Sequence, residues 1–143
     1  MNKYPLSNYH FQVLWGGTRI GFTEVTGLTI EHTAIDFREG ITLDDEISKM
    51  PGIQKYSNVV LKRGIVSGDN EFYEWVNTID NNEVERRNVV ISLLNEDHEP
   101  VMVWKLEKAW PVKLVGPTLS SESSEVCMES LELVYEKITI ETP

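Results

Sequence analysis

The sequence predicts a mainly β protein built from two packed antiparallel sheets, a split β-barrel or sandwich, with one α-helix. Most apolar residues alternate with polar ones over short runs, and one segment has helical spacing instead. The 143 residues fit one domain, and such a domain buries roughly 68–70% of its unfolded surface. We therefore expect residues 1–143 to form a single domain that needs no disulfide or metal.

Alternation begins near the N-terminus, where Tyr9–Trp15 predicts a strand with aromatic residues on one face. Gly16-Gly17 then predicts a tight hairpin turn into a return strand that contains Phe22. In the next run the apolar residues move from even positions, such as Ile30, to odd positions, such as Ile35. This change of parity predicts a bulge, or a strand that changes neighbours part-way.

Residues 40–56 form the longest segment without periodicity, and long loops in compact domains are usually functional. If the segment is a projecting hairpin, two arms of about eight residues would reach roughly 25 Å. The alternative is an insertion without its own structure. Pro51-Gly52 predicts a type II turn that closes this segment. From Ser57 the chain predicts a strand with Val59 and Leu61 on one face.

A helix is predicted for about residues 69–80, where Asp69 or Asn70 could cap its start. Its apolar residues lie at i, i+3, i+4 and i+7, and they are Phe72, Trp75, Val76 and Ile79. An aromatic stripe at this spacing indicates core packing.

The C-terminal half predicts three further strands. Val89–Leu94 and Val101–Lys108 read as hairpin partners across a polar turn. Pro111 is expected to interrupt the pattern, since proline cannot donate to a central ladder. The last strand, about 126–137, contains Cys127, which we expect to be a small buried hydrophobe.

The charge and residue types argue against catalysis and against nucleic-acid binding. The formal net charge is -10, and the acidic residues are dispersed, whereas phosphate binding needs a basic stripe. His10, His32 and His98 fall in three different predicted elements, and no partner is expected to orient one of them beside Cys127. We therefore predict no catalytic residues, no cofactor and no metal site.

No membrane anchor is expected either. The N-terminus lacks the apolar core of a secretory signal, and no apolar run approaches the ~20 residues of a membrane span. Synthesis and folding in the cytoplasm follow as the expectation. A β-rich domain of this size exposes edge strands, and pairing side by side into a closed ring would remove them. A small soluble monomeric binding module is the alternative.

Segments spread over nearly the whole chain resemble the tail-tube family of contractile phages, extracellular injection particles and, more distantly, the tube protein of type VI secretion. Their order along the chain matches the order in the family. They are Phe11–Trp15 (FQVLW), Gly21–Leu28 (GFTEVTGL), Pro51–Gly64 (PGIQKYSNVVLKRG), Asp69–Trp75 (DNEFYEW), Val90–Asn95 (VISLLN), Ala109–Lys113 (AWPVK) and Glu129–Leu133 (ESLEL).

The resemblance implies a hexameric ring that stacks into a hollow tube inside a contractile sheath. It implies that the long connector, residues 40–56, contacts neighbouring subunits and rings. The subunit and ring contacts then fall at Arg38, Glu39, Asp44, Asp45, Glu46, Met50, Pro51 and Gly52.

The partners implied are further copies of the chain, a sheath protein, baseplate or spike proteins, cap proteins, and a lumen cargo or tape-measure protein. The resemblance favours an injection particle assembled in the bacterial cytoplasm and then released. The alternative is the tail tube of a contractile phage that conducts DNA. In either case an acidic lumen would repel a polyanion and limit sticking.

Overall fold

The computed structural model describes residues 10–17, 22–37, 48–80 and 83–143. These residues form strands β1 to β9 and the helix α1. In chain order the elements are β1 (Phe11–Leu14), β2 (Phe22–Thr26), β3 (Ile30–Phe37), β4 (Ser48–Tyr56), β5 (Val59–Gly64), α1 (Glu71–Val76), β6 (Arg87–Leu94), β7 (Pro100–Val115), β8 (Met128–Val134) and β9 (Lys137–Glu141).

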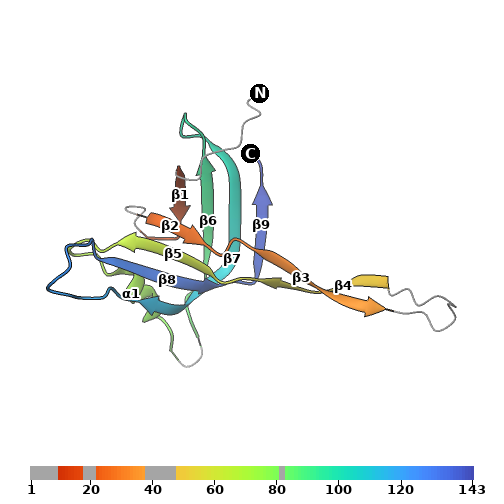
Figure 1. The fold of residues 1–143 in the computed structure, drawn as a ribbon, viewed down its shortest axis with the longest axis horizontal. Helices are drawn as coiled ribbons and strands as arrows, with labels where there is room; N and C mark the ends of the chain where they lie inside the picture. Colours follow the sequence, from red (N-terminus) through yellow and green to blue (C-terminus); the bar gives the residue numbers. More distant parts are fainter. Residues whose placement is uncertain (1–9, 18–21, 38–47, 81–82) are drawn as a thin grey trace.

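Two antiparallel sheets make up the body, and β7 belongs to both of them (Figure 1). Its first part pairs with β6 and β9, and its last part, Trp110–Val115, pairs with β8. The second sheet continues through β5 to β2. The predicted fold class, two antiparallel sheets and one helix, is confirmed.

The strand β7 changes sheets at Lys108, which has a φ of 54°. Its backbone N–H donates to Asn88 Oδ1 over 3.2 Å, and the β6–β7 register shifts there. Pro111 follows inside the same strand, opposite Leu133 of β8. Pro111 does not end the strand, but the β7–β8 register shifts between Pro111 and Lys113, so the expected interruption is present as an irregularity within a continuous β7.

The predicted hairpin at Gly16-Gly17 is also wrong. β1 pairs with β6, so that Phe11 lies opposite Leu93, while β2 pairs with β5 in the other sheet. Trp15 is fully buried at this point, and a Cβ on Gly17 would lie 2.5 Å from its ring. Gly17 therefore packs directly against the Trp15 ring, and β1 and β2 lie in different sheets instead of forming a hairpin.

The core centres on the ring of Trp15, which directly follows β1, and on aromatic rings of α1. Trp15 meets Phe72 edge-on at 5.0 Å between centroids and Trp75 at 5.9 Å. Trp75 also donates its indole N–H to the carbonyl of Glu85 over 2.7 Å. The helix is shorter than the predicted 69–80, and Ile79 beyond its end is exposed rather than in the core. In the described residues no helix has the length and apolarity to cross a membrane.

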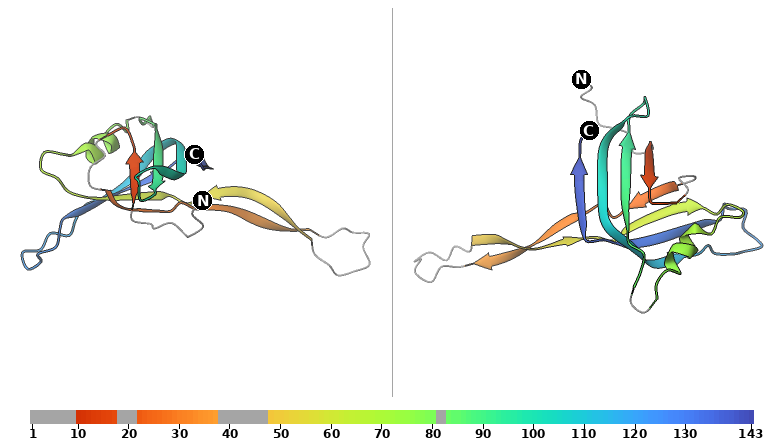
Figure 2. Two further views of the ribbon diagram at one scale, coloured as in Figure 1. Left: turned by 90° about the horizontal axis from the view of Figure 1, so that it is seen from above. Right: turned by 180° about the vertical axis from the view of Figure 1, so that it is seen from behind.

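An arm made of β3 and β4 projects from the body (Figures 1 and 2). Ser48–Tyr56 is thus a strand, and the described part of the predicted loop 40–56 has regular structure. Pro51 and Gly52 lie within β4, so the predicted type II turn is wrong. The register shifts between His32 and Ala34, so a bulge is present as expected, but its extra residue lies in β4 and not in the run whose parity changes.

Candidate assembly surface

The arm carries large apolar side chains that nothing in the described chain covers. Every residue of β3 is exposed, and so are most residues of β4. Ile35 and Met50 lie opposite each other and are 46% and 47% exposed. Ile53 is 74% exposed. A concentration of apolar residues on a thin projecting sheet is typical of a surface that another molecule covers.

The outer apolar residues of β3 lie on the opposite face from Ile30, which is nearest the body. The gap from Ala34 to His32 faces two residues of β4, Gly52 and Ile53, so the extra residue lies in β4. β3 keeps its regular alternation, and Ile30 and Ile35 therefore lie on opposite faces of it. We define the outer apolar face as Ile35, Phe37 and Met50.

The predicted contact residues divide into two groups. Met50, Pro51 and Gly52 lie in β4, with Met50 on the outer apolar face. A Cβ on Gly52 would lie 2.7 Å from the carbonyl oxygen of Thr33, so the bulge requires glycine there. The others are Arg38, Glu39, Asp44, Asp45 and Glu46, which lie outside the described residues and stay predictions.

The arm joins the body through a bend at Gly27, whose φ is +92°. The register is the same on both sides of this bend, so β2–β5 and β3–β4 are two parts of one long hairpin. A Cβ on Gly27 would lie 2.0 Å from the carbonyl oxygen of Asn58. The close approach of the two strands therefore excludes any side chain at this position.

Tyr135, which follows β8, contacts the arm where it leaves the body. Its hydroxyl donates to the carbonyl oxygen of Ser57 over 2.7 Å, and its ring stacks on Tyr56 at 5.5 Å between centroids. Asn58 Nδ2 donates to Glu132 Oε2 over 3.1 Å beside it. Burial raises the pKa of the Tyr135 phenol, and the neighbouring Tyr56 raises it further.

An ion network inside the body was missed by sequence reasoning. Arg63 is 2% exposed; its Nη2 lies 3.1 Å from Asp69 Oδ1 and its Nε lies 3.0 Å from Glu129 Oε1. Nη1 is 3.9 Å from Glu71 Oε2. Asp69 Oδ1 also accepts the backbone N–H of Glu71, so the network holds the start of α1 against β5 and β8.

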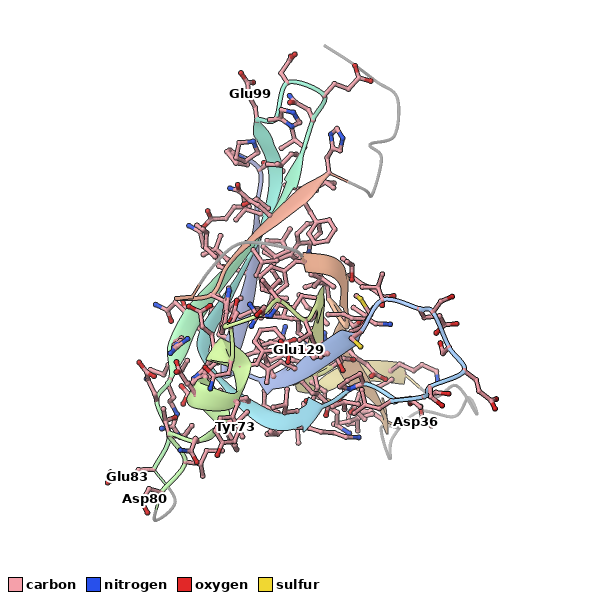
Figure 3. All side chains as sticks on the ribbon, turned by 90° about the vertical axis from the view of Figure 1, so that its left-hand side faces the viewer. Asp36, Tyr73, Asp80, Glu83, Glu99 and Glu129 are labelled. Carbon is pink, nitrogen blue, oxygen red and sulfur yellow. The ribbon has the colours of Figure 1, made fainter. Side chains whose placement is uncertain are left out.

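The described residues contain no group of three or more His, Cys, Asp or Glu that could hold a metal ion. The fold does bring His10 and His98 together, with their ring centroids 5.3 Å apart. Cys127 is exposed, so its predicted burial is wrong, because β8 begins only at Met128. Figure 3 shows the labelled carboxylates Asp36, Glu99 and Glu129 in separate parts of the molecule.

Three further strands of the described chain offer uncovered backbone, and they are β1, β2 and β9, which pairs only with β7. β1 and β2 stand at the ends of the strand order, and each pairs with a single strand of the described chain. A cavity of about 970 Å³ lies between them, lined by apolar side chains that include Phe11, Val25 and Trp104 and by polar ones that include Glu24 and Lys62. Such edges are usually covered in native proteins.

Comparison with known families gives a match over most of the chain. The sequence model of the family described as T4-like virus tail tube protein gp19 matches residues 7–139. Curated protein sequences give no match.

Solved structures agree in fold and, for some, in sequence. A chain in the cryo-EM structure of an extracellular contractile injection system, the PVC sheath-tube complex in its extended state, is 30% identical. The match covers 99% of this chain and 94% of that one, with a TM-score of 0.89. A chain of the anti-feeding prophage cap, the AFP tube terminating cap, is 33% identical over 100% and 95% of the two chains, with a TM-score of 0.90.

A more distant structure shares the fold alone. Hcp1 from Flavobacterium johnsoniae is 14% identical over 94% of this chain and 97% of that chain, and the TM-score is 0.59.

Proposed function

Because the chain belongs to the T4-like virus tail tube protein family, we propose that it builds the inner tube of a contractile injection particle. Copies join side by side into hexameric rings, and the rings stack into a hollow, rigid tube. Contraction of a surrounding sheath drives this tube through a target envelope. Its role is structural and involves no catalysis.

The exposed arm is the observation that carries this proposal. A two-stranded sheet is marginally stable in water by itself, yet β3 and β4 project with an uncovered outer apolar face. Cover from a second copy of the chain would bury Ile35, Phe37 and Met50. The uncovered edges of β1 and β2 add backbone groups that a neighbouring copy could pair.

The two surfaces that meet in such a contact are different, because the arm of one copy lies against another part of the next copy. Such heterologous contacts close into rings or continue as filaments. A tube of stacked rings needs both outcomes: closure within each ring and continued growth from one ring to the next.

An injection particle is favoured over a phage by the relatives. Chains of two extracellular or phage-derived injection systems match this chain at 30–33% identity over nearly its full length. The second candidate is the tail tube of a contractile phage that conducts DNA, which the family description favours. A small monomeric binding module is the third, and it leaves the uncovered arm without a purpose.

The partners follow from the same relatives. Chains that match this one come from a sheath-tube complex, a sheath/tube terminator, a tube cap and a baseplate. We propose corresponding contacts with sheath, cap and baseplate or spike proteins, and a cargo or tape-measure protein in the lumen. Assembly takes place in the bacterial cytoplasm before release of the particle.

Negative-stain electron microscopy of the purified chain at increasing concentration tests the proposal. We expect rings or tubes for the parent protein, and monomers for a variant that carries both Ile35→Ser and Met50→Ser. Ile79→Ser is the matched control, since Ile79 is exposed to a similar extent but lies beyond α1. Featureless monomers of the parent protein, or normal tubes from the double variant, would contradict the proposal.

A further inference from the structure

Among the described residues, the arm has support only where it joins the body. All of β3 is exposed, and in β4 only Gly52 and Tyr56 are half-buried. The nine residues of β4 span roughly 30 Å. A rotation of about 10° at the root would therefore move the far end of the strand by roughly 5 Å. The direction of the arm depends on the contacts at its root.

Tyr135 supplies root contacts from a different strand pair. It follows β8, which has no backbone pairing with β3 or β4. Its hydroxyl reaches the Ser57 carbonyl at 2.7 Å, and its ring lies against Tyr56 at a 27° interplanar angle. Ser57 in turn donates its N–H to Thr29 across the hairpin. Tyr135 thus contacts the β4 side of the arm directly, and the β3 side only through the Ser57–Thr29 hydrogen bond.

We propose that Tyr135 is the positioning residue that sets the direction of the arm, and so sets whether the arm can reach a second copy. Asn58 and Glu132 assist it through their hydrogen bond of 3.1 Å. The inference rests on the proposed function, because it concerns the same arm. A subunit whose arm samples many directions is competent for assembly only during the fraction of time spent in the correct one, and its apparent affinity falls by that fraction.

The bend itself permits such motion unless something restrains it. Gly27 lies at a φ of +92°. Glycine can adopt this φ and many other backbone conformations at little cost in free energy. The hydroxyl bond and the ring stack restrict the opposite strand at Tyr56 and Ser57. The energetic effect of one hydrogen bond corresponds to a factor of about five in an equilibrium.

Spin labels report the arm direction directly. Cys127 is exposed and serves as the label site on the body, and Ser48→Cys adds a nearly isosteric site at the far end of β4. Double electron–electron resonance on labelled chains, diluted with unlabelled protein, gives the distance distribution. We expect a narrow peak for the labelled parent, a broader one for Tyr135→Phe and the broadest for Tyr135→Ala. The exposed Tyr73→Phe on α1 is the control and leaves the peak unchanged.

Assembly of the unlabelled variants gives the second readout. The concentration at which tubes form should rise about fivefold in Tyr135→Phe, and further in Tyr135→Ala, with Tyr73→Phe at the parent value. Identical distance distributions in the parent and both Tyr135 variants would overturn the inference, as would unchanged tube formation in Tyr135→Ala. If the parent protein forms no rings, the proposed function fails, while the spin-label comparison still decides whether Tyr135 directs the arm.

Discussion

The guanidinium carbon of Arg63 lies 4.0 Å from the centroid of the Phe72 ring. A cation thus rests on the first turn of α1, between that ring and the carboxylates of Asp69 and Glu129. The carboxylates are themselves mostly buried. The interior of this body therefore combines an aromatic cluster with a network of charges that depends on one arginine.

Arg63→Met should lower the free energy of unfolding by about 3 kcal/mol, because it leaves buried carboxylates without their cation. Urea denaturation followed by tryptophan fluorescence measures the change. Arg86→Met, at an exposed position in the same protein, is the control and should stay within ~0.5 kcal/mol of the parent. Equal effects of the two substitutions would show that the network contributes little.

Gly27→Ala should lower the free energy of unfolding by about 2 kcal/mol or more, since the new Cβ would strike the Asn58 carbonyl at a positive φ. The comparison is Gly116→Ala, where nothing lies within 4 Å of the added Cβ. Thermal unfolding of both variants separates them. A Gly27→Ala protein as stable as the Gly116→Ala protein would mean that the bend relaxes freely.

Tyr135 should make the fold sensitive to strongly alkaline pH. Its phenol pKa lies above the usual value of 10.0 in the folded chain, so the folded state favours the protonated form. The corresponding stability is fully present below pH 10 and declines as the pH rises through the raised pKa. Unfolding titrations of the parent and Tyr135→Phe should therefore converge at high pH. A constant difference between them across that range would contradict the assignment.

Cys127 should react with a thiol reagent such as DTNB in the folded chain, because its side chain is exposed. We expect one equivalent to react without denaturant, at a rate close to that in urea. The Cys127→Ser variant supplies the blank. Reaction that begins only after unfolding would place the thiol in the interior.

Local patterns predicted much of the fold. Alternation located most strands, the spacing of Phe72 and Trp75 located the helix, and the change of parity before Ile35 predicted the bulge. These features depend on neighbours in the sequence. The pairing of β1 with β6 depends on where Trp15 is buried, which no local pattern reports.

The candidate site was only partly predictable. Met50, Pro51 and Gly52 came from a family resemblance and a turn motif, and they proved to lie in a strand because a bulge with Thr33 accommodates the glycine. The burial of Arg63 could have been predicted from the sequence. This residue shares the parity of Val59 and Leu61, both fully buried, so the apolar face of the strand predicted its burial.

The order of pairing in the body has a consequence for how the subunit is made. β3–β4 and β6–β7 join strands that are close in the sequence, whereas Val59 of β5 must find Leu133 of β8. Closing long loops costs more entropy, so distant pairings form late and slow the folding of β proteins. We expect the arm hairpin to form while the body is still open. A newly made chain would then expose its outer apolar face before Tyr135 is in place to fix the direction of the arm. Premature association of chains at that stage competes with the correct assembly of the tube.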